Sequence, residues 1–179
     1  MHANNKKELN KNPFLKEEIV FKNSWKKLSI DDINEAVPLD FPKKKEFMDF
    51  YLTTNGGCFT KGAYIYRDNF YEIKKNDYNV IEVSSFFHIP LIEDDEDSEY
   101  TLSIPEAAER REGYSNKFDE FVLFHIPFAD NFGDNDFWID VQTGEVKYID
   151  YEECDSPDDA ILIAPSFIEF CEHLQAKRR

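Results

Sequence analysis

The sequence predicts an α+β fold in which a single sheet of about six strands, largely antiparallel or mixed, packs against flanking helices. Helix-forming patterns stand near both ends of the chain, and the aromatic and β-branched runs between them are interrupted by one helical segment instead of alternating with helices. With 179 residues, 41% hydrophobic and 16% aromatic, the chain can bury one substantial core. We therefore expect one domain at 13–179, preceded by a flexible, lysine-rich segment at 1–12.

The first expected helix begins at Ser29. Ser29 and Asp32 have the spacing of a capping box, in which each side chain bonds the other residue's free backbone amide. The apolar side of this short helix would consist of Ile30, Ile33 and Val37.

A longer amphipathic helix is expected within residues 41–57. Wound at a helical period, its aromatic and aliphatic residues between 47 and 52 fall on one face. Asp40 and Pro42 suit its start. The double glycine at 56–57 suits its end, because glycine adopts left-handed backbone conformations without a Cβ clash.

The first strands are expected at 58–66 and 70–73, separated by a turn at 67–69, and at 80–89. A solvated loop should follow, because residues 93–99 are almost all acidic and cannot be buried. The helical interruption then falls at 103–111, with a proline in its first turn.

The last third of the chain should complete the sheet. Residues 121–128 form an apolar run without alternation, which indicates a central strand covered on both faces. Residues 137–141 and 146–151 flank a turn and predict a β-hairpin. Ser166 has capping-box spacing with Glu169, and it opens a closing helix whose Phe167, Phe170, Cys171 and Leu174 recur at helical spacing.

The charge distribution excludes several classes of function. The formal net charge is −16, and Lys147 is the only Lys or Arg between residues 119 and 172, so nucleic acid should be repelled. No basic amphipathic helix or membrane-spanning run is present, so we expect no membrane contact and a cytoplasmic location. Three cysteines without paired spacing indicate neither a disulfide framework nor a zinc site.

The residues that could support catalysis have simpler interpretations. A hydrolase or metal-dependent enzyme would have to be built on His88, His125 and the turn at 130–136. That turn does not form a calcium loop, because Phe132 stands at a ligand position and the glycine comes too early. Strand histidines with satisfied hydrogen bonds and an Asx- and Gly-rich turn explain the same residues. We therefore expect no catalytic residue, no cofactor and no metal.

The acidic surface is the candidate binding feature. One interpretation is an unstructured loop that keeps the protein soluble; the other is an anionic face that attracts and steers a basic partner protein. On the second interpretation the partner-binding residues are those of the loop and of a second patch: Glu93, Asp94, Asp95, Glu96, Asp97, Glu99, Asp130, Asp134 and Asp136. Aromatic residues that the sequence does not identify would supply much of the binding energy.

Three segments in order resemble the SUKH superfamily, which includes the Smi/Knr cell-wall regulators of yeast and many bacterial immunity proteins. They are Phe41-Pro42 through Asn55-Gly56-Gly57, Ile126 to Asp150 with its Gly133-Asp134 turn, and Ile163 to Phe170. The sequence departs from the family pattern at Phe41, where Leu is usual, and in an acidic insertion near 92–118.

The resemblance implies a SUKH-like domain without an enzymatic site. In bacteria it implies an immunity protein, or antitoxin, that binds and occludes a cognate toxin of a polymorphic or contact-dependent toxin system. Such a toxin is often a nuclease, and a nuclease carries a positive phosphate-binding groove that an acidic protein can occupy. The alternative is a non-enzymatic regulatory scaffold of the cell-wall-regulator type. We expect a monomer in either case.

Overall fold

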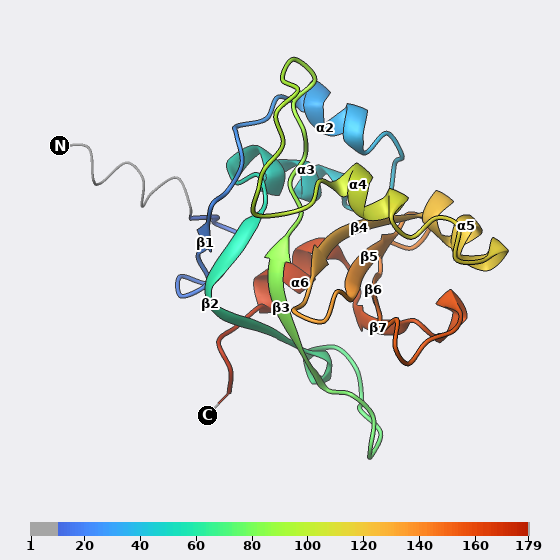
Figure 1. Cartoon of the computed structure of the whole chain (residues 1–179). Helices are drawn as coiled ribbons and strands as arrows, with labels where there is room; N and C mark the ends of the chain where they lie inside the picture. The colour runs from blue at the N-terminus through green and yellow to red at the C-terminus, as the bar shows by residue number, and fades with distance from the viewer. Residues whose placement is uncertain (1–10, 179) are drawn as a thin grey trace.

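The computed structural model describes residues 11–178 and contains one seven-stranded sheet. The strands stand in the sheet in the order in which they occur along the chain, and every pair of neighbouring strands is antiparallel. The predicted single α+β sheet is therefore confirmed, with seven strands instead of six and with no parallel pair of strands in the described part of the chain. Figure 1 shows the strands with helices on both sides.

The elements have the following bounds. The strands are β1 Phe21–Lys22, β2 Gly57–Tyr66, β3 Val80–Phe86, β4 His125–Asp130, β5 Asp136–Asp140, β6 Val146–Ile149 and β7 Ile161–Ala164. The α-helices are α2 Ile30–Ala36, α3 Lys44–Thr53, α4 Ile104–Glu109, α5 Asn116–Leu123 and α6 Phe167–His173. Two short 3-10 helices, η1 Arg67–Asn69 and η2 Pro157–Asp159, complete them.

One face of the sheet, which we call the inner face, is covered by α3 and α6, which lie behind the strands in Figure 1. Phe86 of β3 is completely buried at its centre. Six phenylalanine rings surround it with centroids 5.3 to 6.2 Å away: Phe21, Phe50, Phe59, Phe128, Phe167 and Phe170. These seven phenylalanine rings thus form one packed aromatic core.

The opposite, outer face is covered only in part. Phe137 belongs to the inner core, so the next residue of β5, Trp138, points outward. There α5 places Phe118 and Phe121 against Trp138 and Ile149 in a second, smaller apolar cluster. The face is more polar over β2, β3 and β4, where Cys58, Ser85 and Asp130 stand opposite one another in register.

The predicted helix starts are largely confirmed. The hydroxyls of Ser29, Ser103 and Ser166 each accept a hydrogen bond of 3.2 Å from the backbone amide three residues later. Ser29 and Asp32 form the complete capping box. The expected apolar positions of the closing helix are all buried. On α2 the expectation is wrong for Ile30, which is 56% exposed.

The start of α3 differs from the prediction. The helix begins at Lys44, and Lys43 precedes it with a left-handed backbone, so neither Asp40 nor Pro42 occupies the expected helical position. At the other end the double glycine has the expected positive φ values, +65° and +131°. A Cβ at Gly56 would lie 2.7 Å from the carbonyl oxygens of Phe86 and Phe87. Only glycine therefore lets the backbone after α3 pass this close to the end of β3.

Two strand predictions are wrong. Residues 121–123 belong to α5, which Ser115 caps, because this helix can then bury its apolar side against Trp138. Periodicity alone does not separate a short buried helix from a buried strand. The remainder of that run is β4, which is indeed the central strand.

Residues 70–73 form no strand. The predicted turn at 67–69 is η1, and the partner of β2 is β3. The buried Arg67 holds this segment by donating from Nε to the carbonyl oxygen of Leu162, 2.7 Å away.

The predicted flexible segment at 1–12 lies mostly outside the described residues. Its last residue, Asn12, is described and is buried, and its side-chain amide donates to the carbonyl oxygen of Phe50 at 3.1 Å. The packed domain therefore includes Asn12.

Candidate partner-binding surface

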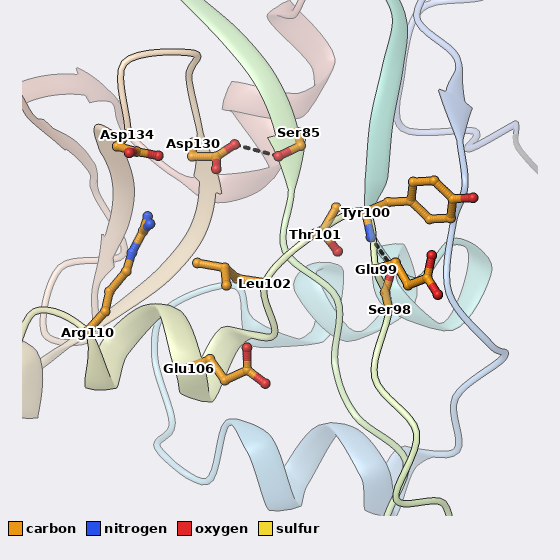
Figure 2. Close-up of a pocket in the computed structure, with 10 residues that line it drawn as sticks. All are labelled: Ser85, Ser98, Glu99, Tyr100, Thr101, Leu102, Glu106, Arg110, Asp130 and Asp134. Carbon is orange, nitrogen blue, oxygen red and sulfur yellow. Dashed lines mark hydrogen bonds between the residues drawn. The ribbon is translucent and has the colours of Figure 1, made fainter.

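The open part of the outer face contains two adjoining hollows, of about 380 Å³ and 550 Å³. They share Ser85, Tyr100, Asp130 and Asp134, and we call them together the outer-face groove. Sheet residues form its floor, the loop before α4 and α4 itself form one wall, and the turn between β4 and β5 forms the other (Figure 2).

The floor of the groove follows from strand register. Cys58 pairs with Ser85, and Ser85 pairs with Asp130, so their side chains emerge on the same face of three neighbouring strands. The hydroxyl of Ser85 donates to the Asp130 carboxylate, as Figure 2 shows. Burial raises the pKa of Asp130 to about 6, and the Ser85 hydrogen bond offsets only part of that effect. Burial also raises the pKa of the Cys58 thiol, which disfavours a reactive thiolate.

The walls carry two exposed aromatic side chains. Tyr100 is 59% exposed, and Phe132 is 84% exposed at the tip of the β4–β5 turn. That turn is ordered by Asn131, whose side-chain oxygen accepts from the amide of Gly133 at 2.9 Å. Exposed aromatic residues on a rigid support supply large contact area at a protein interface.

The buried ion cluster beside the groove contains Asp136. Its carboxylate accepts hydrogen bonds from Arg110, from Nε of Arg111 at 2.7 Å and from the hydroxyl of Tyr151 at 3.0 Å. Because Asp136 is 0% exposed, it cannot touch a partner, and its inclusion among the predicted contact residues is not compatible with this structure. Its ion pairs with Arg110 and Arg111 instead connect the end of α4 to β5. Figure 2 shows the Arg110 side chain pointing from the end of α4 into the groove.

The other predicted acidic residues fall into two places. Glu99, Asp130 and Asp134 line the groove, so the loop and the second patch do meet there. Glu93, Asp94, Asp95, Glu96 and Asp97 lie on the loop away from the groove lining. Asp94 and Glu96 form salt bridges with Lys26, and Asp97 contacts His88.

The two candidate histidines have separate surroundings. His88 is 1% exposed and contacts the side chains of Thr101 and Asp97. His125 stacks on Phe121 with ring centroids 3.6 Å apart, and Lys147 approaches its Nε2 at 3.1 Å. Burial lowers the pKa of His125 to about 4, so its imidazole is neutral at pH 7.

The described residues contain no metal site or membrane span. No group of three or more His, Cys, Asp or Glu side chains between residues 11 and 178 is arranged to hold a metal ion. No helix in that range is long and apolar enough to cross a membrane.

Sequence reasoning did not identify the neutral part of the groove. Cys58 and Ser85 carry no sequence signal, because their role depends on strand register. Phe132 did carry one: a large aromatic residue inside an Asx- and Gly-rich turn has no core to enter, which favours an exposed position.

Comparison with known proteins gives one family match. The model of the SMI1 / KNR4 family (SUKH-1) matches residues 26–173. This range includes both walls of the groove and the acidic insertion. No curated protein and no solved structure matches the chain.

Proposed function

The chain belongs to the SMI1 / KNR4 family (SUKH-1), and on this basis we propose that it is an immunity protein that neutralises a cationic nuclease toxin by occlusion. The observation that carries the proposal is the outer-face groove, where acidic side chains from two distant segments meet between the exposed rings of Tyr100 and Phe132. The chain itself would make or break no bond.

The charge of the chain suits a nuclease as the partner. A nuclease must hold phosphates in a positive groove, and a protein of net charge −16 is attracted to such a groove at long range. Lys147 is the only Lys or Arg among the many acidic residues of 119–172, so the field over that segment is negative. Association should therefore be fast and should slow as salt is added.

The aromatic walls suit the short-range part of the same interface. Charges at the edge of an interface contribute more to association rate and specificity than to affinity, whereas desolvated aromatic residues dominate binding energy. Phe132 and Tyr100 lie beside the carboxylates of Asp134 and Glu99, so a basic partner segment could contact charge and ring together. Inhibition would follow from blocking the toxin's substrate groove.

A direct test uses a cationic nuclease domain that the purified chain captures in a pull-down. We expect purified chain to abolish cleavage of DNA or RNA at about one equivalent and to bind more slowly as salt is raised. The matched variants are Asp134→Lys in the groove and Asp49→Lys on the exposed face of α3. Both change the net charge equally, and only the groove variant should weaken inhibition strongly.

The alternative is a regulatory scaffold that uses the same surface to bind endogenous proteins. Full cleavage activity in the presence of excess chain, together with stable binding of a housekeeping protein through the groove, would favour the scaffold and contradict the immunity proposal.

A further inference from the structure

The loop between β3 and α4 is attached to the body of the protein at several points. We call residues 91–103 the strap; it rises beside α2 before it returns to α4 (Figure 1). We propose that the strap is a docked specificity element: Asp94, Glu96 and Asp97 fix it in place, and Glu93, Asp95 and Glu99 face the partner. This inference rests on the proposed function, but its docking part can be measured in the free protein.

The inner attachment is a latch made by His88. The imidazole Nε2 lies 3.2 Å from the Asp97 carboxylate, and Nδ1 lies 3.0 Å from the Thr101 hydroxyl. The arrangement fits an imidazole that donates to Asp97 and accepts from Thr101. Backbone bonds continue the latch, since the amide of His88 donates to Leu102 and its carbonyl accepts from Ile104. The strap thus supplies both polar side-chain partners of a buried residue.

The outer attachment is a clamp made by Lys26. Its ammonium group bonds Asp94 and lies 2.9 Å from Glu96, so two acids of the strap share one cation. The Lys26 ammonium also lies 5.0 Å from the centroid of the Trp25 ring, and that ring packs on His88 with centroids 5.8 Å apart. Clamp and latch therefore meet at Trp25.

A third contact fixes the start of the strap. The amide of Ile92 donates to the Asp32 carboxylate at 2.9 Å, and Asp32 is itself buried and held by the capping box of α2. The helix cap and the strap therefore share one carboxylate.

These attachments divide the acidic residues of the strap into two sets. Asp94, Glu96 and Asp97, the anchored set, have cationic or histidine partners. Glu93, Asp95 and Glu99, the free set, are exposed and form no salt bridge with any described residue. The carbonyl of Tyr100 meets the Cys58 thiol at 3.6 Å, which places the end of the strap on the groove. The free set and Tyr100 can therefore vary without loosening the strap.

The division gives two variants that remove the same charge. The triple variant Asp94→Asn, Glu96→Gln, Asp97→Asn changes the anchored set, and Glu93→Gln, Asp95→Asn, Glu99→Gln changes the free set. Amide hydrogen exchange over residues 92–104 of the free protein should accelerate about tenfold in the anchored variant and stay unchanged in the free variant. Any other pattern overturns the division, whether or not a toxin is found.

Association with a nuclease domain that the chain captures and inhibits gives the second readout. Both triple variants remove three negative charges, so both should lose long-range steering equally. The free variant should also dissociate faster from the nuclease, because contacts are lost although its strap is still docked. The anchored variant should dissociate faster from the nuclease because its strap is loose. Restoring the docking of the anchored variant with a disulfide across the strap should recover its residence time; failure to do so would contradict the role of the strap in recognition.

His88 is a positioning residue in this proposal. One variant of His88 and one of its partner Thr101 test the latch, and a second variant of His88 tests its rescue. His88→Phe keeps a ring against Trp25 but removes both hydrogen bonds, and Thr101→Val removes one hydroxyl at a partly exposed position. Exchange over residues 92–104 should accelerate about tenfold in the first and about threefold in the second. His88→Gln should recover part of the protection, because its amide can donate to Asp97. If His88→Phe fails to fold, Thr101→Val decides; unchanged exchange there overturns the latch.

Discussion

The inner and outer faces of the sheet are built by alternating residues of the same strands and do different things. On the inner face Phe86 stands in register with Ala129, and α3 and α6 exclude water from the rings around it. One residue earlier, Ser85 stands in register with Asp130 and opens to the groove. Because side chains alternate along a strand, one segment can carry the core and the candidate recognition surface without a conflict between them. The comparison predicts that changes to the two faces have separable effects.

The largest effect is expected at the centre of the inner face. Phe86→Ala removes a ring that six other rings contact, and the free energy of unfolding should fall by about 3–5 kcal/mol. Urea denaturation at pH 7 measures this loss. A loss below about 1 kcal/mol would show that the inner face tolerates a cavity, and it would contradict the assignment of the inner face to the core.

The next effect is expected at the buried ion cluster, where the outer face behaves like a core. Asp136→Asn leaves Arg110 and Arg111 beside each other without the carboxylate between them, and should destabilise the fold by about 3 kcal/mol. The control is Asp134→Asn, an exposed neighbour that should change stability by less than about 0.5 kcal/mol. Equal losses in the two variants would contradict the assignment of Asp136 to structure.

A smaller, pH-dependent effect is expected at Asp130. Its pKa is raised from 3.8 to about 6, so between these values the folded state holds a proton that the unfolded state has released. Stability should therefore fall as pH rises from about 4 to about 6, by about 2 kcal/mol, and stay lower above that. Asp130→Asn should remove this dependence; urea midpoints at pH 4, 5, 6 and 7 measure it.

His125 has the opposite sign and must be separated from this measurement. Its pKa is lowered from 6.5 to about 4, so its contribution to stability is present above pH 6.5 and is lost as pH falls toward 4. The quantity to follow is therefore the difference between wild type and Asp130→Asn, in which the His125 contribution cancels. A difference that does not vary with pH would contradict the raised pKa.

The smallest effect on stability is expected at Phe132. Because this ring is almost wholly exposed at the tip of a turn, Phe132→Ala should change the free energy of unfolding by less than about 0.5 kcal/mol. On the proposed function, the same variant should weaken toxin binding by about 2 kcal/mol, measured by titration calorimetry. A destabilised variant with unchanged binding would reverse the roles of the two faces.

The sequence predicted the parts of the fold whose signals are local. Ser29, Ser103 and Ser166 begin helices through bonds to residues only three positions away, and the hairpin of β5 and β6 is joined by a short turn. Residues 121–123 were assigned wrongly because their helix is favoured by contact with Trp138, which no local pattern reveals.

The candidate site was predicted in its charge but not in its arrangement. The acidic residues are evident from composition, but whether each is free depends on distant partners. Lys26 engages Asp94 and Glu96 from 68 and 70 positions away in the chain. Asp136 is buried by two arginines on the α4 side, while Asp130, opposite it in register, faces the groove. Such distinctions follow from tertiary contacts alone.

The order of the strands has a consequence for synthesis. Since each strand pairs with the next one along the chain, the sheet can grow in the order in which its strands are made, although the connections 23–56 and 87–124 are long. Yet Phe167 and Phe170, which cover the ring of Phe86, lie on α6 and follow all seven strands in the chain. A nascent chain would therefore hold a sheet whose inner face is covered by α3 but not yet by α6, and docking of α6 would be the step that removes the remaining aromatic surface from water and from aggregation.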